Sequence, residues 1–278
     1  MRLLAISDLH LANAANRDAL AQLPHHGDDW LILAGDVAER LDHIRDAFAL
    51  LTRLFARVIW VPGNHDLWTV REEHPVDAPL GGEAKYRALI TLAREFGVVT
   101  PEDPYPVWTG PGGPCIVAPL FLLYDYSFRP AEIAREEVIG WSREGSAVCA
   151  DEILLDPAPH VSREAWCARR CDETQSRLEA LDPALQTILV NHYPLRHELV
   201  RIPRIPRFSP WCGTKRTEDW HVRFNARAAI YGHLHVRRTD IRDGTRFEEV
   251  SLGYPRQWDR SRSLASYLRE ILPGPEGG

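Results

Sequence analysis

The chain has 278 residues, of which 45% are hydrophobic and 26% are charged, and its formal net charge is −6. This balance is ordinary for a soluble globular protein, and the length suits one large α/β domain with an insertion. An acidic chain does not attract nucleic acid through its overall charge. An anionic substrate must therefore be held by a local positive site, such as bound metal or an arginine cluster.

The N-terminus and the cysteines predict a cytoplasmic protein. The first residues lack the basic and apolar regions of a signal peptide, and no apolar run approaches the roughly 18 residues that a membrane helix needs. The five cysteines are odd in number and have no regular spacing, which is typical of reduced thiols. We therefore expect no membrane association and no disulfide framework.

The first part of the chain alternates between strand-like and helical patterns. Short apolar runs are typical of buried strands, and stretches with apolar residues three and four apart are typical of amphipathic helices. In order, the predicted elements are a strand at 3–7, a helix at 16–23, a strand at 30–34, a helix at 41–55, a strand at 58–61 and a helix at 83–96. This order predicts an α/β core.

The second part is less regular. Further strands are predicted at 115–120, 187–190, 228–231, 237–240 and 247–252, with a helix at 163–181. Asp243-Gly244 lies between the last two strands and predicts a hairpin turn. Residues 127–160 are predicted to be an insertion, either a cap over the site or a surface elaboration. We expect a single domain over residues 1–272 and a flexible tail at 273–278.

Small polar clusters follow five of the apolar runs. They are Asp8-Leu9-His10, Gly35-Asp36, Gly63-Asn64-His65-Asp66, Asn191-His192 and Gly232-His233-Leu234-His235. Ligands of α/β sheets collect beyond the carboxyl ends of the strands, so these clusters are expected to converge on one site. A single Asp-x-His is more often a polar strand end, but all of the clusters in this order are difficult to explain by chance.

The residue types in these clusters predict a centre for two divalent metals. Carboxylate, imidazole and amide donors suit Mn, the first choice here, and also Fe, Zn, Mg or Ni, and no thiolate is present. Asp36 can bridge two cations because a carboxylate has two oxygens. Two cations about 3.5–4 Å apart lower the pKa of a shared water and hold the attacking and departing oxygens.

The order of the clusters resembles that of the calcineurin-like metallophosphoesterase superfamily, and the matching motifs run from Asp8 to His235. The resemblance implies a four-layer αββα sandwich with mixed sheets and a site at one sheet edge. It implies that one metal is held by Asp8, His10, Asp36 and His235, and the other by Asp36, Asn64, His192 and His233.

The resemblance also implies a catalytic role for His65. This histidine would bind no metal, would face the phosphoryl group and the leaving oxygen, and would be oriented by Asp66. A hydroxide bridging the metals would attack phosphorus in line. His65 would stabilise charge on the phosphoryl oxygens and protonate the leaving oxygen. The expected enzyme is a binuclear metallophosphoesterase.

Residues 195–218 form a basic loop that begins at the rim of the expected site. Prolines within it restrict the backbone, which favours a shaped loop. We predict that the loop grips a second phosphate or stacks a ring of the substrate, and the alternative is a solvated loop or an oligomer contact. The predicted substrate contacts are Arg201, Arg204, Arg207, Trp211 and Arg216.

The predicted substrate is a small phosphorylated or nucleotide-like metabolite, cleaved as a monoester or as a diester. A DNA or RNA nuclease is an alternative that the acidic chain argues against. A catalytically silent scaffold is a second alternative, which the complete ligand set argues against. The closing run 253–258 serves either substrate contact or packing. The sequence leaves the oligomeric state open.

Overall fold

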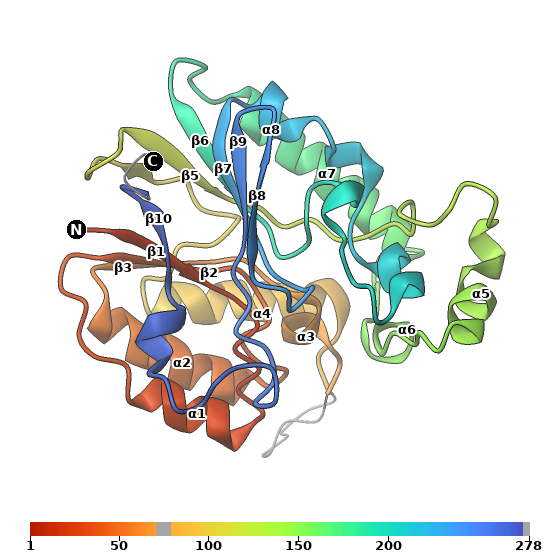
Figure 1. The fold of residues 1–278 in the computed structure, drawn as a ribbon, viewed down its shortest axis with the longest axis horizontal. Coiled ribbons are helices and arrows are strands. Elements are labelled where there is room, and N and C mark those ends of the chain that lie inside the picture. Colours follow the sequence, from red (N-terminus) through yellow and green to blue (C-terminus); the bar gives the residue numbers. More distant parts are fainter. Residues whose placement is uncertain (71–78, 275–278) are drawn as a thin grey trace.

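The computed structural model describes residues 1–70 and 79–274. Its strands form two sheets that lie face to face, with helices on their outer sides (Figure 1). The first sheet has the order β10 (Arg269–Leu272), β1 (Leu3–Ile6), β2 (Trp30–Leu33) and β3 (Arg57–Trp60). The second has the order β4 (Val107–Trp108), β5 (Cys115–Pro119), β6 (Gln186–Val190), β7 (Ala226–Tyr231), β9 (Thr245–Glu249) and β8 (Arg238–Arg242).

Helices complete the layers on both sides and confirm the predicted sandwich. The first sheet is covered by α1 (Ala14–Ala21), α2 (Leu41–Leu54) and α4 (Gly82–Glu95), and the short α3 (Asn64–Leu67) follows β3. The second sheet carries α7 (Arg163–Glu179) and α8 (Trp220–Arg223), while α5 (Val138–Glu144) and α6 (Asp151–Leu154) extend to one side (Figure 1). No helix in the described ranges is both long enough and apolar enough to cross a membrane.

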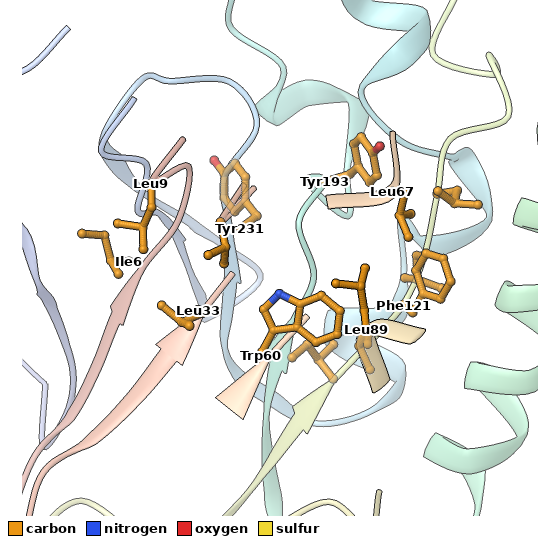
Figure 2. Packing of buried hydrophobic residues seen from close by; sticks show 14 of the residues in the cluster. Ile6, Leu9, Leu33, Trp60, Leu67, Leu89, Phe121, Tyr193 and Tyr231 are labelled. Carbon is orange, nitrogen blue, oxygen red and sulfur yellow. The ribbon is translucent and has the colours of Figure 1, made fainter. Parts of the chain in front are cut away.

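The central strands, such as β1, β2 and β5, are buried on both faces, which explains their continuous apolar runs. In β1, Leu3 and Ala5 pack between the sheets, whereas Leu4 and Ile6 belong to the cluster beneath the helices. Alternate residues of a strand point to opposite faces, so one short run supplies both cores. Figure 2 shows part of the helix-side cluster, where Trp60 of β3 lies beside Leu89 of α4.

Parallel pairing brings the predicted clusters to one edge. Strands β1, β2 and β3 are parallel in the first sheet, and β5, β6, β7 and β9 are parallel in the second. The polar clusters follow β1, β2, β3, β6 and β7, at their carboxyl ends. An isolated parallel bridge between Ser7 and Ser251 joins the two sheets at this edge. The fold therefore gathers all of the clusters.

The C-terminal part was predicted incompletely. The hairpin at Asp243-Gly244 is confirmed, because β8 and β9 are antiparallel, but β9 also pairs parallel with β7. Strand β10 was missed, and so was β4. β10 contains Arg269 and Glu270 and pairs antiparallel with β1, at the other end of the chain. Of the predicted tail, residues 275–278 lie outside the described residues.

The insertion at 127–160 packs against segments that flank the site. The Leu154 carbonyl accepts a hydrogen bond of 2.7 Å from the Thr69 backbone N–H, just after α3. The Ser142 hydroxyl donates to the Arg207 carbonyl at 2.8 Å, in the basic loop. These contacts tie the insertion to two segments that are distant in sequence.

Candidate metal centre

The backbone turns sharply where the polar clusters leave their strands. Five residues have a left-handed φ of 43° to 70°, a region that residues other than glycine seldom adopt. They are Asp8, His10, Asp36, His233 and His235. Strained conformations of this kind persist where the surrounding structure fixes them, and they cluster at functional sites.

Two glycines allow the backbone to approach the carboxylates closely. A Cβ atom on Gly63 would lie 2.1 Å from Asp36 Oδ1. A Cβ atom on Gly232 would lie 2.2 Å from Ser7 Oγ and 2.3 Å from Asp8 Oδ2. Since real Cβ atoms do not come so near to other atoms, only glycine fits at either position.

One half of the site consists of Asp8, His10 and His235. His235 Nε2 lies 3.0 Å from Asp8 Oδ1 and 3.1 Å from His10 Nε2. The other carboxylate oxygen, Asp8 Oδ2, accepts hydrogen bonds from the hydroxyls of Ser7 at 2.6 Å and Ser251 at 2.7 Å. The serines hold the carboxylate so that Oδ1 and the two imidazoles converge on a common point.

The other half is formed around His192. Its Nδ1 donates to the Ala34 carbonyl at 2.9 Å, which leaves Nε2 facing Asn64 Oδ1 at 3.2 Å and Asp36 Oδ2 at 3.4 Å. The Nε2 atom of His233 is buried and has no hydrogen-bond partner in the described part of the chain. Buried polar atoms are nearly always paired, so this nitrogen fits a ligand position.

The donor atoms form overlapping groups that fit divalent cations. In each group the ligand atoms lie within 4.8 Å of one another, and Asp36 belongs to two of the groups. The groups are Asp8, His10 and His235; His10, Asp36 and His65; and Asp8, Asp36 and His192. Oxygen and imidazole donors of this kind suit hard and borderline ions, and all seven predicted ligands lie at this edge.

Opposite charges stabilise each other in this buried cluster. Burial alone would lower the pKa of His192, but the Asp36 carboxylate and its hydrogen bond raise it to about 10. Burial would also lower the pKa of His235, but the nearby Asp8 carboxylate raises this pKa to about 9. Burial lowers the pKa of His233 to about 3, and the charge on His192 adds to this effect. The carboxylates thus require positive charge, which cations or protons can supply.

His65 is oriented by Glu39, contrary to the predicted role of Asp66. His65 Nδ1 lies 2.8 Å from Glu39 Oε1, and its ring packs on Trp68 with centroids 3.6 Å apart. The Asp66 carboxylate instead accepts hydrogen bonds from backbone N–H groups. These donors are Asp36 at 3.1 Å, Val37 at 2.8 Å, Ala38 at 3.1 Å and Gly63 at 2.9 Å. Asp66 therefore fixes the turn that carries Asp36.

Two further supporting residues were missed by sequence reasoning. Asp151 is fully buried, and its Oδ1 accepts from Asn64 Nδ2 at 3.0 Å and from Trp68 Nε1 at 2.7 Å. Gln257 Oε1 lies 2.8 Å from His235 Nδ1. Asp151 belongs to the insertion, and it fixes the amide so that Asn64 Oδ1 faces the site. Neither residue lies in a strand-end cluster, and Gln257 belongs to the run 253–258, for which the sequence left substrate contact and packing open.

A pocket of about 280 Å³ opens above these residues, here called the metal pocket. It is lined by Asp36, Asn64, His65, Ile202, Ile205, Phe208, His233, Leu234, His235, Tyr254, Arg256 and Gln257. The loop 195–218 supplies an apolar wall through Ile202, Ile205 and Phe208. The insertion contributes nothing to this lining. In the run 253–258, Tyr254, Arg256 and Gln257 line the pocket, whereas Trp258 packs inward and its Nε1 donates to Asn16 Oδ1 at 3.2 Å.

The predicted substrate residues of the loop do not line the metal pocket. Trp211 is buried in the core, and its Nε1 donates to Glu152 Oε1 at 2.7 Å. Arg207 donates to the Trp141 carbonyl at 2.7 Å, and Arg216 pairs with Asp172. Arg201 lies 3.9 Å from Asp240, and Arg204 is exposed. Carboxylates and carbonyls of neighbouring elements hold Arg201, Arg207 and Arg216, and none of the five predicted residues lines the metal pocket.

The chain matches the model of a known family. The model of the calcineurin-like phosphoesterases matches residues 1–237. The chain belongs to this family. It is accordingly a hydrolase of phosphate esters, as the sequence predicted, and the family chemistry depends on divalent metals.

One similar protein matches this chain both in sequence and in structure. The [acyl-carrier-protein] phosphodiesterase PptH of Mycobacterium tuberculosis is 51% identical over 274 residues, which cover 98% of this chain and 83% of that protein. The crystal structure of phosphopantetheinyl hydrolase (PptH) from Mycobacterium tuberculosis is 50% identical, with a TM-score of 0.93. It covers 100% of this chain and 98% of that chain, and it confirms the predicted fold of two mixed sheets with helices.

Proposed function

We propose that this protein is a phosphodiesterase that releases phosphopantetheine from an acyl-carrier protein. The observation that carries the proposal is the 51% identity to the [acyl-carrier-protein] phosphodiesterase PptH across 98% of this chain. The bond cleaved would be the phosphodiester that joins the arm to the carrier protein. The substrate would then be a group attached to a protein, and not the free small metabolite that the sequence predicted.

The shape of the metal pocket supports this substrate. Its lining includes the Asp36 carboxylate and the imidazoles of His65, His233 and His235, and the part formed by Ile202, Ile205 and Phe208 is apolar. A phosphodiester with a flexible, uncharged arm matches both surfaces, with its phosphate at the polar end and its arm along the apolar wall. Ile205 is 40% exposed, so the wall is open to solvent and accessible to an arm that a protein carries.

We assign two cation positions to the seven predicted ligands, with Mn as the first candidate and Fe, Zn, Mg or Ni as alternatives. One position has Asp8, His10, Asp36 and His235, and the other has Asp36, Asn64, His192 and His233. When bound, such cations activate water and neutralise charge on phosphoryl oxygens. Asp36 is the residue suited to both positions, because it shares one donor group with His10 and its Oδ2 lies 3.4 Å from His192 Nε2.

His65 is the proposed proton donor to the leaving oxygen. Its imidazole lines the metal pocket, and Glu39 holds the ring through Nδ1, which leaves Nε2 for the substrate. Burial would lower the pKa of His65, but the Asp36 and Glu39 carboxylates raise it. A protonated imidazole can donate a hydrogen bond to the phosphoryl group and then a proton to the departing oxygen.

We include a cytoplasmic location in the proposal. All five cysteines are free and buried. Disulfides form and persist in oxidising compartments, so buried free thiols fit a reducing one.

The test uses a carrier protein that bears its phosphopantetheine arm. We expect the purified enzyme with Mn²⁺ to convert it to the arm-free protein, detected by intact-protein mass spectrometry, whereas an Asp36→Asn variant leaves it unchanged. A chromogenic phosphomonoester and single-stranded DNA serve as competing substrates. If the carrier protein keeps its arm while either of these is hydrolysed, the proposal is wrong, and a phosphatase or a nuclease takes its place.

A further inference from the structure

The segment Gly253-Tyr254-Pro255-Arg256-Gln257, here called the C-terminal turn, contributes two unpartnered groups to the metal pocket. It follows β9 and lies beyond residues 1–237, which the family model matches. Its side chains are candidates for what distinguishes this enzyme from other members.

Hydrogen bonds hold the C-terminal turn in one conformation. Gln257 Oε1 accepts from the Tyr254 backbone N–H at 2.7 Å, and Gln257 N donates to the Tyr254 carbonyl at 2.8 Å. Gly253 N donates to the Asp8 carbonyl at 3.0 Å, and the Gly253 carbonyl accepts from Asn16 Nδ2 at 3.0 Å. The same Gln257 oxygen contacts the imidazole of His235. The turn is thus built into the site.

Tyr254 presents its hydroxyl from a fixed ring. The ring stacks on His10 with centroids 4.3 Å apart and an interplanar angle of 13°. Tyr254 lines the metal pocket, and no hydrogen bond of its hydroxyl is found among residues 1–70 and 79–274. A phenol is protonated at neutral pH, so it offers a donor to an incoming ligand.

Arg256 is the single arginine or lysine among the described residues that line the metal pocket. It is exposed, and within the described ranges no carboxylate pairs with it. Arg207 and Arg216 of loop 195–218 differ from Arg256, since they pair with acidic residues of other elements. A guanidinium without a protein partner binds phosphate oxygens well, because its planar donors match their geometry.

We propose that the C-terminal turn binds the phosphodiester group of the substrate. The Arg256 guanidinium contacts the two non-bridging oxygens, and the Tyr254 hydroxyl donates a hydrogen bond to one of them. Arg256 and Tyr254 then determine the affinity for the phosphodiester, whereas the strand-end residues bind the metals. The inference rests on the proposed function only in that the substrate is a phosphodiester, and it does not require the carrier protein.

The experiment compares Arg256→Met and Tyr254→Phe with Arg260→Met, a matched change at an exposed arginine outside the metal pocket. Each variant is assayed with bis(4-nitrophenyl) phosphate and with the arm-bearing carrier protein. Inhibition by inorganic phosphate and metal content are measured in parallel. We expect Arg256→Met to raise KM and the phosphate inhibition constant about tenfold, the effect of one charged hydrogen bond. Tyr254→Phe should raise both about threefold.

Metal content should equal that of the wild type in every variant, and Arg256→Lys should recover part of the affinity, because it restores the charge without the planar fork. The proposal is overturned if Arg256→Met has the same KM and phosphate inhibition as Arg260→Met. It is also overturned if Arg256→Met or Tyr254→Phe loses metal, which would make the turn a support for the ligands.

Failure of the proposed function gives a different pattern. In that case the wild type hydrolyses the chromogenic diester but leaves the carrier protein intact, and the KM of the variants on the chromogenic diester still decides the role of the turn. An enzyme that hydrolyses neither diester overturns both proposals.

Discussion

The strand-end clusters and the loop 195–218 both carry residues that suggest a function, but only the clusters lie where they were predicted. Asp8, Asp36 and His192 converge within one group of donor atoms. The loop reaches the metal pocket with apolar side chains, while Arg207 turns to Glu144 of α5 and Arg216 turns to Asp172 of α7.

The difference has a physical origin in side-chain length and backbone restraint. Aspartate and histidine side chains are short, and parallel pairing together with left-handed turns fixes the backbone that bears them. Arginine side chains are long, adopt many rotamers, and settle against whichever carboxylate or carbonyl is near. A strand end therefore specifies the direction of its side chain locally, whereas the partner of a loop arginine depends on the rest of the fold.

The largest effect is expected for Asp36→Asn. The change removes the charge that two groups of donors share, so metal binding and hydrolysis of either diester should fall by more than about 100-fold. Elemental analysis and turnover measure the two effects. Asp46→Asn, at an exposed position of α2, is the control and should match the wild type. An Asp36→Asn variant with full metal content and activity would contradict the assignment of Asp36 as a metal ligand.

Asp151→Ala should have the next largest effect. Without this carboxylate the Asn64 amide loses its hydrogen bond and can rotate away from the site. We expect metal affinity to fall about 10- to 100-fold, as for other residues that orient ligands. Titration of the metal-free protein measures it. Asp172→Asn on α7 is the control. Equal metal affinity in both variants would show that Asp151 does not support the metal ligands.

Ile205→Ser tests the apolar wall. The side chain is 40% exposed, so folding should be preserved, while the wall loses part of its contact with the substrate arm. We expect KM for the carrier protein to rise about tenfold, which corresponds to roughly 1.4 kcal/mol of lost apolar contact. Arg204→Met should leave this KM unchanged. If Arg204→Met raised this KM more than Ile205→Ser did, the basic residues of the loop would be the substrate contacts.

Arg207→Met should give the smallest effect, and it should act on stability and not on catalysis. The guanidinium lies over the Trp141 ring at 5.1 Å and pairs with Glu144 at 3.2 Å on a partly exposed surface. Its loss should lower the free energy of unfolding by about 1 kcal/mol in denaturant titrations. A changed KM at unchanged stability would contradict the structural role.

The sequence by itself determined the α/β order and the positions of seven metal-type side chains at the strand ends. Each of these depends on a local pattern: an apolar run, the glycine that permits a close approach, and the polar residue directly after a strand. Because parallel strands end at one edge, local order along the chain was enough to predict convergence in space.

Only the tertiary structure decided which residues support and surround the ligands. Glu39, Asp151 and Gln257 each contact a site residue that belongs to another strand end or loop. The strand β10 forms because β1 offers it an edge at the other end of the chain. The C-terminal turn enters the site because Gly253 bonds to Asp8. Such contacts join segments far apart in sequence, and their geometry exists only once both sheets are packed.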